Sequence, residues 1–312
     1  MGIAAIVGAG LIGRAWAHVF ARAGWQVRVW DPSPHQREVA AALIGRSLHD
    51  LARQGLVADP VGAGERVTVA ASLAEALKDA QYVQESGPET LEAKIATFAE
   101  LDALAPAAAL LASSTSAIVA SRFTERLPGR ARCIVAHPVN PPHLVPVVEL
   151  CGAPWTSAET RARARAILRE VGQVPIDVKK EIDGFILNRL QAALLSEAFR
   201  LVEEGYVSPE DLDHTVADGL GLRWAFMGPF ETIELNAPGG IADYCERYVS
   251  WFRRYAADPP GAAVWDDARW KLAVQAWNRT PAPAWIAEKS RWRDDRLARI
   301  VAHKRAQKPH SD

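Results

Sequence analysis

His137 and Glu149 stand on either side of a proline-rich segment, and they are the residue types of a general base and its orienting carboxylate. The segment reads His137-Pro-Val-Asn-Pro-Pro-His-Leu-Val-Pro-Val-Val-Glu149. Its four internal prolines restrict the backbone, so the imidazole and the carboxylate can be held in one geometry instead of being sampled. The spacing therefore predicts a site that abstracts protons.

Hydrogen-bond donors stand near this pair in the sequence. Ser113-Ser114-Thr115-Ser116 precedes it, and Asn188 follows it in an amphipathic run that begins at Gly184. Hydroxyl and amide donors suit an oxygen that changes its charge during a reaction. Seven other histidines occur in the chain, so His137 alone is weak evidence of catalysis, and the combination carries the prediction.

A glycine-rich turn near the N-terminus predicts a dinucleotide site. It follows the apolar run of residues 3–7, opens a segment of helical spacing, and consists of Gly8, Ala9, Gly10, Leu11, Ile12 and Gly13. Gly8 permits the tight turn, Gly10 lets the backbone approach a pyrophosphate, and Gly13 allows close helix packing. A structural turn that binds nothing is the alternative, but the position between strand and helix favours the dinucleotide.

Asp31 indicates which dinucleotide is bound. It ends a second alternating run eighteen residues after Gly13, where a carboxylate can bind a ribose 2′-hydroxyl and repel a 2′-phosphate. NAD is therefore predicted over NADP. Arg37 is the nearby cation that would reverse this preference.

Composition limits the class of protein. The 312 residues are 49% hydrophobic, which is enough for two hydrophobic cores, and the net charge of −1 argues against a nucleic-acid footprint or an anionic membrane surface. Neither a secretion signal nor a membrane-spanning run is expected. The three cysteines, Cys133, Cys151 and Cys245, lack metal-site spacing, so we expect no metal, reduced thiols and a cytoplasmic location.

Short apolar runs alternate with helix-like segments over the first half of the chain. The runs lie at residues 3–7, 26–31, 67–70, 82–85, 110–113, 133–136, 147–150 and 174–179, and the chain reads as helical from Gly184 onward. This order predicts an α/β protein with a Rossmann-type, doubly wound sheet followed by an all-helical part. We expect a nucleotide-binding domain over 1–182 and a helical domain for substrate binding and dimerisation over 183–312.

The helical part contains more apolar surface than one core requires. Residues 184–204 are apolar on two helix faces, which predicts burial between domains or subunits and makes a homodimer the expected state. Ser208-Pro-Glu-Asp211 predicts a capped helix start. Trp270, Trp277, Trp285 and Trp292 recur every seven or eight residues, and we interpret them as a packed helical stripe interrupted at Pro281 and Pro283.

Taken in order, these motifs resemble the 3-hydroxyacyl-CoA dehydrogenase superfamily over essentially the whole chain. The motifs are the glycine turn, Ser-Ser-Thr-Ser116, Ile-Val-Ala-His137-Pro-Val-Asn140-Pro-Pro, Lys180-Glu-Ile-Asp-Gly-Phe-Ile-Leu-Asn188-Arg-Leu-Gln, Arg200-Leu-Val-Glu-Glu-Gly, Asp218-Gly-Leu-Gly-Leu-Arg223-Trp-Ala-Phe-Met-Gly-Pro and Trp292-Arg-Asp. The resemblance implies that His137, Glu149, Ser116 and Asn188 are catalytic. It also implies that Glu89 and Lys94 join Asp31 in holding NAD.

The segment around Arg223 and Trp224 resembles the branch of the superfamily that oxidises gulonate. Arg223 is a candidate for a bidentate pair with a free substrate carboxylate, and an interface salt bridge is its alternative role. Asn140, Ser116, Asn188 and Trp224 are the other candidate substrate residues. His143 replaces the tyrosine typical of that branch, and we interpret it as a further candidate for the pocket.

The expected reaction is the NAD-dependent oxidation of a short, free 3-hydroxy acid, with L-gulonate as the first candidate. Alternatives are a thioester of coenzyme A, L-carnitine with Trp224 in a cage for its quaternary ammonium, and a structural NAD-binding protein without activity. The intact set of Ser116, His137, Glu149 and Asn188 argues against the last alternative.

Overall fold

The computed structural model describes residues 2–307, and its internal contacts divide the chain into two units. Unit 1 consists of Met1–Asn188 together with Pro283–Asp312, and unit 2 is Arg189–Ala282. The predicted division at residue 182 placed everything after it in one domain. The contacts instead group the last helix with the N-terminal sheet.

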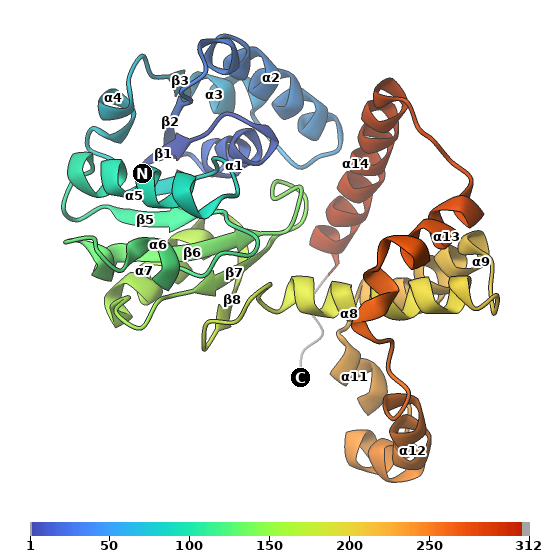
Figure 1. Cartoon of the computed structure of the whole chain (residues 1–312). Helices are drawn as coiled ribbons and strands as arrows, with labels where there is room; N and C mark the ends of the chain where they lie inside the picture. The colour runs from blue at the N-terminus through green and yellow to red at the C-terminus, as the bar shows by residue number, and fades with distance from the viewer. Residues whose placement is uncertain (1, 308–312) are drawn as a thin grey trace. The chain divides into compact units, whose positions relative to one another are not determined.

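Unit 1 is built on one sheet of eight strands (Figure 1). The strands are β1 Ile3–Val7, β2 Gln26–Trp30, β3 Val67–Val69, β4 Tyr82–Glu85, β5 Leu110–Ser113, β6 Cys133–Pro138, β7 Val147–Cys151 and β8 Val174–Val178. Their order is β3-β2-β1-β4-β5-β6-β7-β8, and every neighbouring pair is parallel except β6 and β7. The predicted Rossmann-type, doubly wound sheet is confirmed, with all eight predicted strands present.

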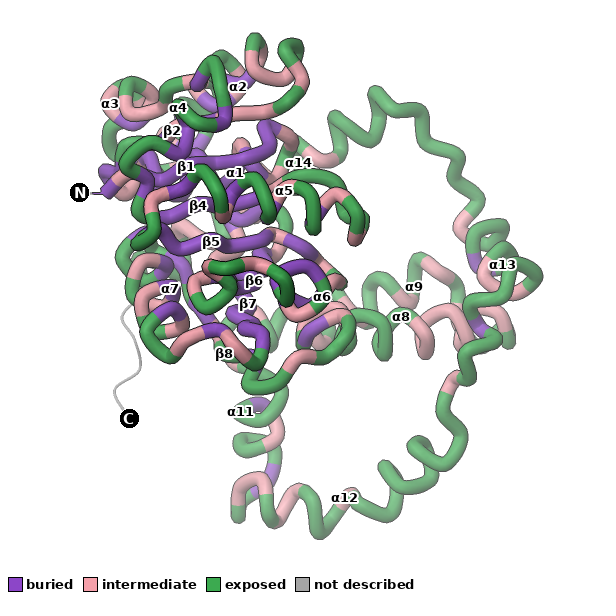
Figure 2. Tube along the Cα trace, turned by 60° about the vertical axis from the view of Figure 1, so that its left-hand side comes forward, coloured by how far each residue is buried: buried purple, intermediate pink, exposed green. Residues whose placement is uncertain are grey.

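Helices cover both faces of this sheet. They are α1 Leu11–Arg22, α2 Pro34–Arg53, α3 Pro60–Glu65, α4 Leu73–Leu77, α5 Leu91–Leu104, α6 Ser121–Thr124 and α7 Ala158–Glu170. Alternate residues of a strand point to opposite faces, so Ala4 and Ile6 join the core under α1, α2 and α7, whereas Ala5 and Val7 join the core under α4 and α5. Figure 2 shows the buried positions concentrated on the strands.

The last helix, α14 Pro283–Ala306, packs on the first of these two cores. Ala298 is buried there, and Leu297, Val301 and Ala302 pack against it. Gln54 Nε2 donates to Asp295 Oδ1 at 2.6 Å. An apolar face of α14 and one polar contact thus join the last helix to unit 1.

Unit 2 is entirely helical. It contains α9 Pro209–His214, α10 Gly221–Trp224, α11 Pro229–Glu234, α12 Gly240–Ala256, α13 Asp267–Trp277 and most of α8 Leu187–Glu203. The predicted helix start at Ser208 is confirmed, because its hydroxyl accepts from the Asp211 amide at 3.1 Å.

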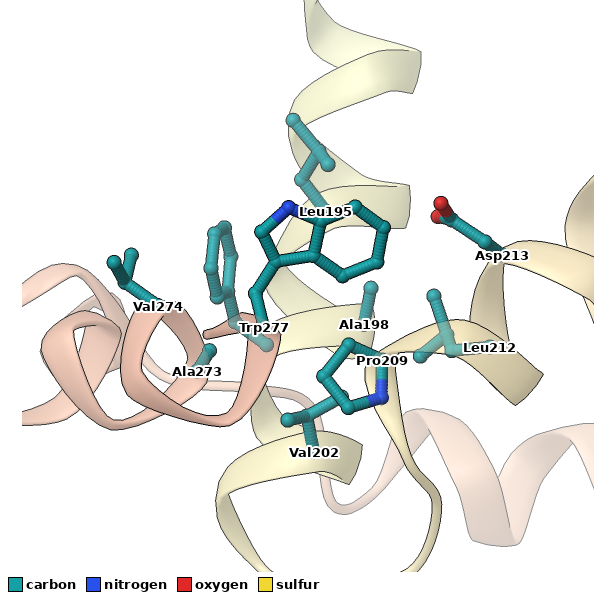
Figure 3. A pocket seen from close by; sticks show the side chains of 10 residues that line it. Leu195, Ala198, Val202, Pro209, Leu212, Asp213, Ala273, Val274 and Trp277 are labelled. Carbon is teal, nitrogen blue, oxygen red and sulfur yellow. The ribbon is translucent and has the colours of Figure 1, made fainter. Parts of the chain in front are cut away.

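Few side chains of unit 2 are buried within it. Among the described residues of this unit, burial is limited to Thr232, Ala237, Val264 and Ala273. An apolar cavity of about 270 Å³ lies between α8, α9 and α13 (Figure 3). Large apolar side chains such as Leu190 and Phe252 are 64% and 49% exposed, so unit 2 does not cover its own apolar surface.

Residues 2–307 contain neither a membrane-spanning helix nor a cluster of metal-ligating side chains. No helix there has the length and apolar character needed to cross a membrane. No cluster of three or more His, Cys, Asp or Glu side chains in that range is placed to hold a metal ion.

Candidate active site

His137 and Glu149 lie directly opposite each other on the antiparallel strands β6 and β7. His137 Nδ1 is 2.8 Å from Glu149 Oε2, and the two residues are 5% and 0% exposed. A carboxylate only accepts hydrogen bonds, so Nδ1 carries a proton, and in the neutral imidazole Nε2 then has the lone pair. No hydrogen bond to Nε2 forms within the described part of the chain, and this nitrogen is free to act as a base.

The second carboxylate oxygen of Glu149 binds the start of α8. Oε1 accepts from the backbone amides of Ile186 at 2.8 Å and Leu187 at 3.0 Å. Burial by itself raises the pKa of Glu149, but the hydrogen bonds from His137 and from these two amides outweigh it, and the pKa is lowered overall. Glu149 is therefore held as a carboxylate.

A turn with two left-handed residues places the amides of Ile186 and Leu187 against Glu149. Gly184 has φ +75° and Phe185 has φ +50°, a left-handed conformation that is uncommon for a phenylalanine. Phe185 is fully buried, and its ring centroid lies 5.4 Å from that of His137. Packing against the imidazole thus compensates for the backbone strain and fixes the ring of His137 from a second side.

Ser116 and Asn188 meet beside this pair. Asn188 Nδ2 donates to the Ser116 carbonyl at 2.8 Å, and Asn188 follows Leu187 directly, so the same turn of α8 connects both pairs. The Ser116 amide donates to Glu89 Oε1 at 2.9 Å, whereas its hydroxyl reaches that oxygen only at 3.5 Å. The Ser116 hydroxyl and the second hydrogen of the Asn188 amide are therefore available to a ligand.

Gly8 and Gly10 lie in the turn between β1 and α1, and Gly13 lies in the first turn of α1. Gly8 has φ +107°, and a Cβ added to it would lie 2.5 Å from the Ser86 carbonyl oxygen. A Cβ on Gly13 would lie 1.8 Å from the Gly8 carbonyl oxygen, whereas one on Gly10 would meet nothing within 4 Å. Gly8 and Gly13 are thus required by the fold, and Gly10 borders open space of the kind that a pyrophosphate needs.

The same turn opens α1. Leu11, Ile12 and Gly13 form its first turn, and Leu11 is 75% exposed. Amides of a first helical turn have no partner within their helix and attract phosphate oxygens. The chemistry and the shape of this turn therefore fit a dinucleotide.

Asp31 follows β2 and binds the glycine turn. Its Oδ2 accepts from the Ala9 amide at 2.7 Å, and its Oδ1 accepts from the Ser33 amide at 2.8 Å. Arg37 donates to the Asp31 carbonyl oxygen at 2.6 Å, not to the carboxylate. The negative charge of Asp31 therefore remains at the position expected for a ribose.

Glu89 and Lys94 differ in their accessibility. Glu89 Oε1 accepts from Thr115 Oγ1 and from the amides of Ser116 and Ala117, and its side chain is 40% exposed. Lys94 is only 1% exposed and donates to both carboxylate oxygens of Glu85 at 2.8 and 2.9 Å. Its ammonium also donates to the Gly87 carbonyl at 3.4 Å and lies 3.7 Å from Glu89.

The candidate substrate residues lie in both units. Asn140 is exposed in the turn after β6, whereas Arg223 and Trp224 end α10 in unit 2. His143 differs from our interpretation as a pocket residue, because its ring packs against His18 of α1 with centroids 5.1 Å apart. It borders a cavity between α2 and α14.

Two residues of the site, Glu85 and Phe185, were not predicted from the sequence. Glu85 ends β4 and binds Lys94, the Ser113 hydroxyl and the Gly87 amide. An acid at the carboxyl end of a buried parallel strand was the available signal. Phe185 gave no such signal, since a left-handed phenylalanine looks like any apolar residue at a helix start.

A Rossmann sheet, a glycine turn shaped for pyrophosphate and a buried histidine–carboxylate pair define the class: an NAD-dependent oxidoreductase acting on CH–OH groups. The 3-hydroxyacyl-CoA dehydrogenase NAD binding domain matches residues 3–182, and the C-terminal domain of the same enzymes matches residues 184–265. The chain belongs to the 3-hydroxyacyl-CoA dehydrogenase family.

Relatives extend over nearly the whole chain. Lambda-crystallin of Oryctolagus cuniculus is 42% identical over 97% of each chain. L-carnitine dehydrogenase of a Pseudomonas species is 34% identical over 95% of this chain and 92% of its own. Among solved structures, an NAD⁺-dependent 5-formyl-3-hydroxy-2-methylpyridine 4-carboxylic acid 5-dehydrogenase superposes with a TM-score of 0.81 at 27% identity, over 98% of both chains.

Proposed function

We propose that this protein oxidises the 3-hydroxyl of a short, free 3-hydroxy acid to the 3-oxo acid, with L-gulonate as the first candidate substrate. The observation that carries the proposal is the 2.8 Å contact between His137 Nδ1 and Glu149 Oε2, which places the proton of a neutral imidazole on Nδ1 and leaves Nε2 to face the hydroxyl as the base. NAD, when bound, accepts the hydride that leaves C3. Removal of a hydroxyl proton then requires a base such as His137.

The four polar residues have separate roles in this proposal. His137 Nε2 takes the hydroxyl proton, and Glu149 stabilises the resulting imidazolium through the existing hydrogen bond. Ser116 Oγ and the second hydrogen of Asn188 Nδ2 bind the substrate oxygen as it becomes a carbonyl. The contact of Asn188 with the Ser116 carbonyl keeps these two donors together.

The preference for NAD rests on Asp31. Its carboxylate is tied to Ala9 and Ser33 and is not paired with Arg37, so a 2′-phosphate would meet an uncompensated negative charge. Gly8, Gly10, Leu11, Ile12 and Gly13 would bind the pyrophosphate. Glu89 and Lys94 would complete the cofactor site, Lys94 by holding the carboxylates around it.

The free-acid substrate is supported by Arg223 and by the relatives. A guanidinium pairs in bidentate fashion with a carboxylate, which a thioester lacks. Asn140 and Trp224 are further proposed contacts of the substrate. L-carnitine, named in one relative, is itself a free 3-hydroxy acid. It is the second candidate, because Trp224 is 42% exposed beside Arg223 and an indole face binds quaternary ammonium groups.

Initial rates of NADH formation test the substrate class. The purified protein would be given L-gulonate, L-3-hydroxybutyrate, L-carnitine and L-3-hydroxybutyryl-CoA, each with NAD and with NADP. We expect turnover of a free acid with NAD, and a loss of kcat/KM on Arg223→Gln with little change for a thioester. Turnover of the thioester alone would show that the substrate is an acyl-CoA and would overturn the free-acid proposal.

A homodimer that forms through unit 2 is also part of the proposal. The exposed apolar side chains of α8 and α12 support it, since surfaces of this kind mark association sites. A cytoplasmic location is proposed from the thiols. All three cysteines are free, and Cys245 is exposed, which suits a reducing compartment.

A further inference from the structure

The hydroxyl of Ser114 is the centre of a polar network under the glycine turn. Its Oγ lies 3.1 Å from Trp16 Nε1, 2.7 Å from Gln84 Nε2 and 2.9 Å from Ser86 Oγ. Trp16 and Gln84 are fully buried. The network joins α1, β4 and β5, the three elements whose ends surround the dinucleotide site.

The direction of each hydrogen bond in this network follows from the groups involved. Gln84 Nε2 lies 3.5 Å from the Ala136 carbonyl, which only accepts, and this contact favours the orientation with Nε2 toward Ala136 and Ser114. In that orientation Oε1 accepts from the Tyr82 hydroxyl at 2.7 Å. The indole of Trp16 only donates. Ser114 Oγ thus accepts twice, which uses both of its lone pairs, and its own hydrogen must go to Ser86 Oγ.

Ser86 is the end of this chain of donors. Its Oγ accepts from Ser114, and within residues 2–307 its own hydroxyl hydrogen has no acceptor. Ser86 is half-buried, so the hydroxyl keeps some access to a ligand. Successive hydrogen bonds of one direction polarise one another, which makes the terminal hydroxyl a stronger donor.

The position of Ser86 in the sheet identifies the part of the ligand that it faces. Ser86 follows the carboxyl end of β4, and its backbone carbonyl lies beside Gly8, the first glycine of the turn, where a Cβ on Gly8 would be 2.5 Å from it. The strand order β2-β1-β4-β5 puts Ser86 on the opposite side of β1 from Asp31, which marks the adenosine ribose. The β4 side of β1 therefore lies toward the nicotinamide half, in the direction of His137 on β6.

We propose that the Ser86 hydroxyl, oriented by Ser114, donates a hydrogen bond to an oxygen of the nicotinamide ribose of NAD or of the phosphate attached to it. Ser86 is thus a cofactor-binding residue, and Ser114 is a positioning residue that acts through it. Trp16, Gln84 and Tyr82 keep the Ser114 hydroxyl pointed in this single direction.

Equilibrium binding to the full-length protein, measured by calorimetry, tests the proposal without requiring turnover. Ser86→Ala is expected to weaken NAD binding about threefold to tenfold, the effect of one lost hydrogen bond. Binding of 5′-AMP, which has only the adenosine half, is expected to be unchanged. Ser86→Thr, which keeps a hydroxyl, is expected to restore NAD affinity. Ser47→Ala, at a half-buried serine of α2, is the matched control and should bind both ligands as the parent does.

The binding measurements can overturn the proposed role of the Ser86 hydroxyl in three ways. Equal NAD affinity in the parent and in Ser86→Ala would overturn the proposal. An equal loss for NAD and 5′-AMP would also overturn it, because the substitution would then act on the glycine turn as a whole. Failure of Ser86→Thr to restore binding would show that the hydroxyl is not the group that matters. Unchanged 5′-AMP binding also shows that the variant has folded.

Discussion

Glu149 uses its two oxygens for different purposes, and this division explains the geometry of the site. Oε2 fixes the tautomer and the orientation of His137, whereas Oε1 holds the first amides of α8. Asn188 belongs to that same helical turn. One buried carboxylate therefore aligns the base and one of the donors that receive the substrate oxygen.

Replacement of His137 tests the assignment of the base. His137→Asn is expected to lower kcat by about a hundredfold to ten-thousandfold, the usual contribution of general base catalysis, because no proton acceptor remains at Nε2. NAD affinity should change little, since the imidazole contacts Glu149 and Phe185, not the glycine turn. His49→Asn, at an exposed histidine of α2, is the control. Retention of parental turnover in His137→Asn would show that another group takes the proton.

His143 makes stability depend on pH. Burial, together with the charges of Arg22 and Arg293, lowers the pKa of His143 from 6.5 to about 4, and His18 packs against the same ring. In the unfolded chain the imidazole of His143 is protonated at a higher pH than in the folded protein. Neutral His143 therefore contributes fully to the stability of the fold above pH 6.5, and this contribution is lost as the pH falls toward 4. Between pH 6.5 and pH 4 this lowers the free energy of unfolding by about 3 kcal/mol.

Urea unfolding between neutral and acidic pH measures this effect. We expect the free energy of unfolding of His143→Gln to fall less steeply with decreasing pH than that of the parent, since one titrating group is absent. His49→Gln should follow the parent curve, because His49 is exposed. Parallel curves for the parent and His143→Gln would show that this imidazole does not carry the acid sensitivity.

Two glycine-to-alanine substitutions near the start of α1 test stability and NAD binding separately, because the added methyl group has a different environment at each position. Gly13→Ala would put a Cβ 1.8 Å from the Gly8 carbonyl oxygen, so α1 must move and stability should fall by several kcal/mol. Gly10→Ala adds a Cβ where no atom lies within 4 Å, and Gly10 has φ −67°, which alanine adopts freely.

Thermal unfolding and NAD titration of the two variants distinguish these roles. Gly10→Ala is expected to melt within about 2 °C of the parent, and to lose NAD affinity by at least about tenfold, because its methyl group occupies the approach of the pyrophosphate. Gly13→Ala should melt markedly lower. Unchanged NAD affinity in Gly10→Ala would place the pyrophosphate elsewhere.

The positions of the strands and helices could be predicted from the spacing of apolar residues in the sequence. Which strand pairs with which, and which core a helix packs against, could not. The eight strands stand out because buried parallel strands are continuous apolar runs between turns. The antiparallel pairing of β6 and β7, which puts His137 opposite Glu149, is not visible in those runs. For α14, the spacing shows an apolar face but not that the N-terminal core covers it.

The four tryptophans are a second case in which the sequence does not show the packing partner. We interpreted four regularly spaced indoles as a packed helical stripe interrupted at Pro281 and Pro283. The interruption is present, but the indoles on its C-terminal side are not buried. Trp270 and Trp277 lie on α13 in unit 2, whereas Trp285 and Trp292 lie on α14 in unit 1 and are 42% and 48% exposed. The predicted break at Pro281 and Pro283 separates the two helices, and the regular spacing does not show which core each helix packs against.

At the scale of the whole molecule, the two units differ in how completely they bury their own apolar residues. Unit 1 has two cores, one on each face of its sheet, whereas the described part of unit 2 buries four residues. On α12, Tyr244, Tyr248, Trp251, Phe252 and Tyr255 follow a helical repeat, and the last three are between 49% and 63% exposed. An exposed aromatic face of this kind is typical of an association site and supports the proposed homodimer.

Sedimentation of α12 variants tests whether that partner is a second copy of the chain. We expect the parent protein to sediment as a dimer, and Phe252→Asp to raise the dimer dissociation constant on the order of a hundredfold, because a carboxylate would be buried without a partner. Glu246→Lys, on an exposed polar position of the same helix, changes charge without removing apolar surface and should remain dimeric. A parent that sediments as a monomer at all concentrations would refute the dimer. A dimer that survives Phe252→Asp would show that the interface lies away from α12, with the apolar face of α8 as the next surface to test.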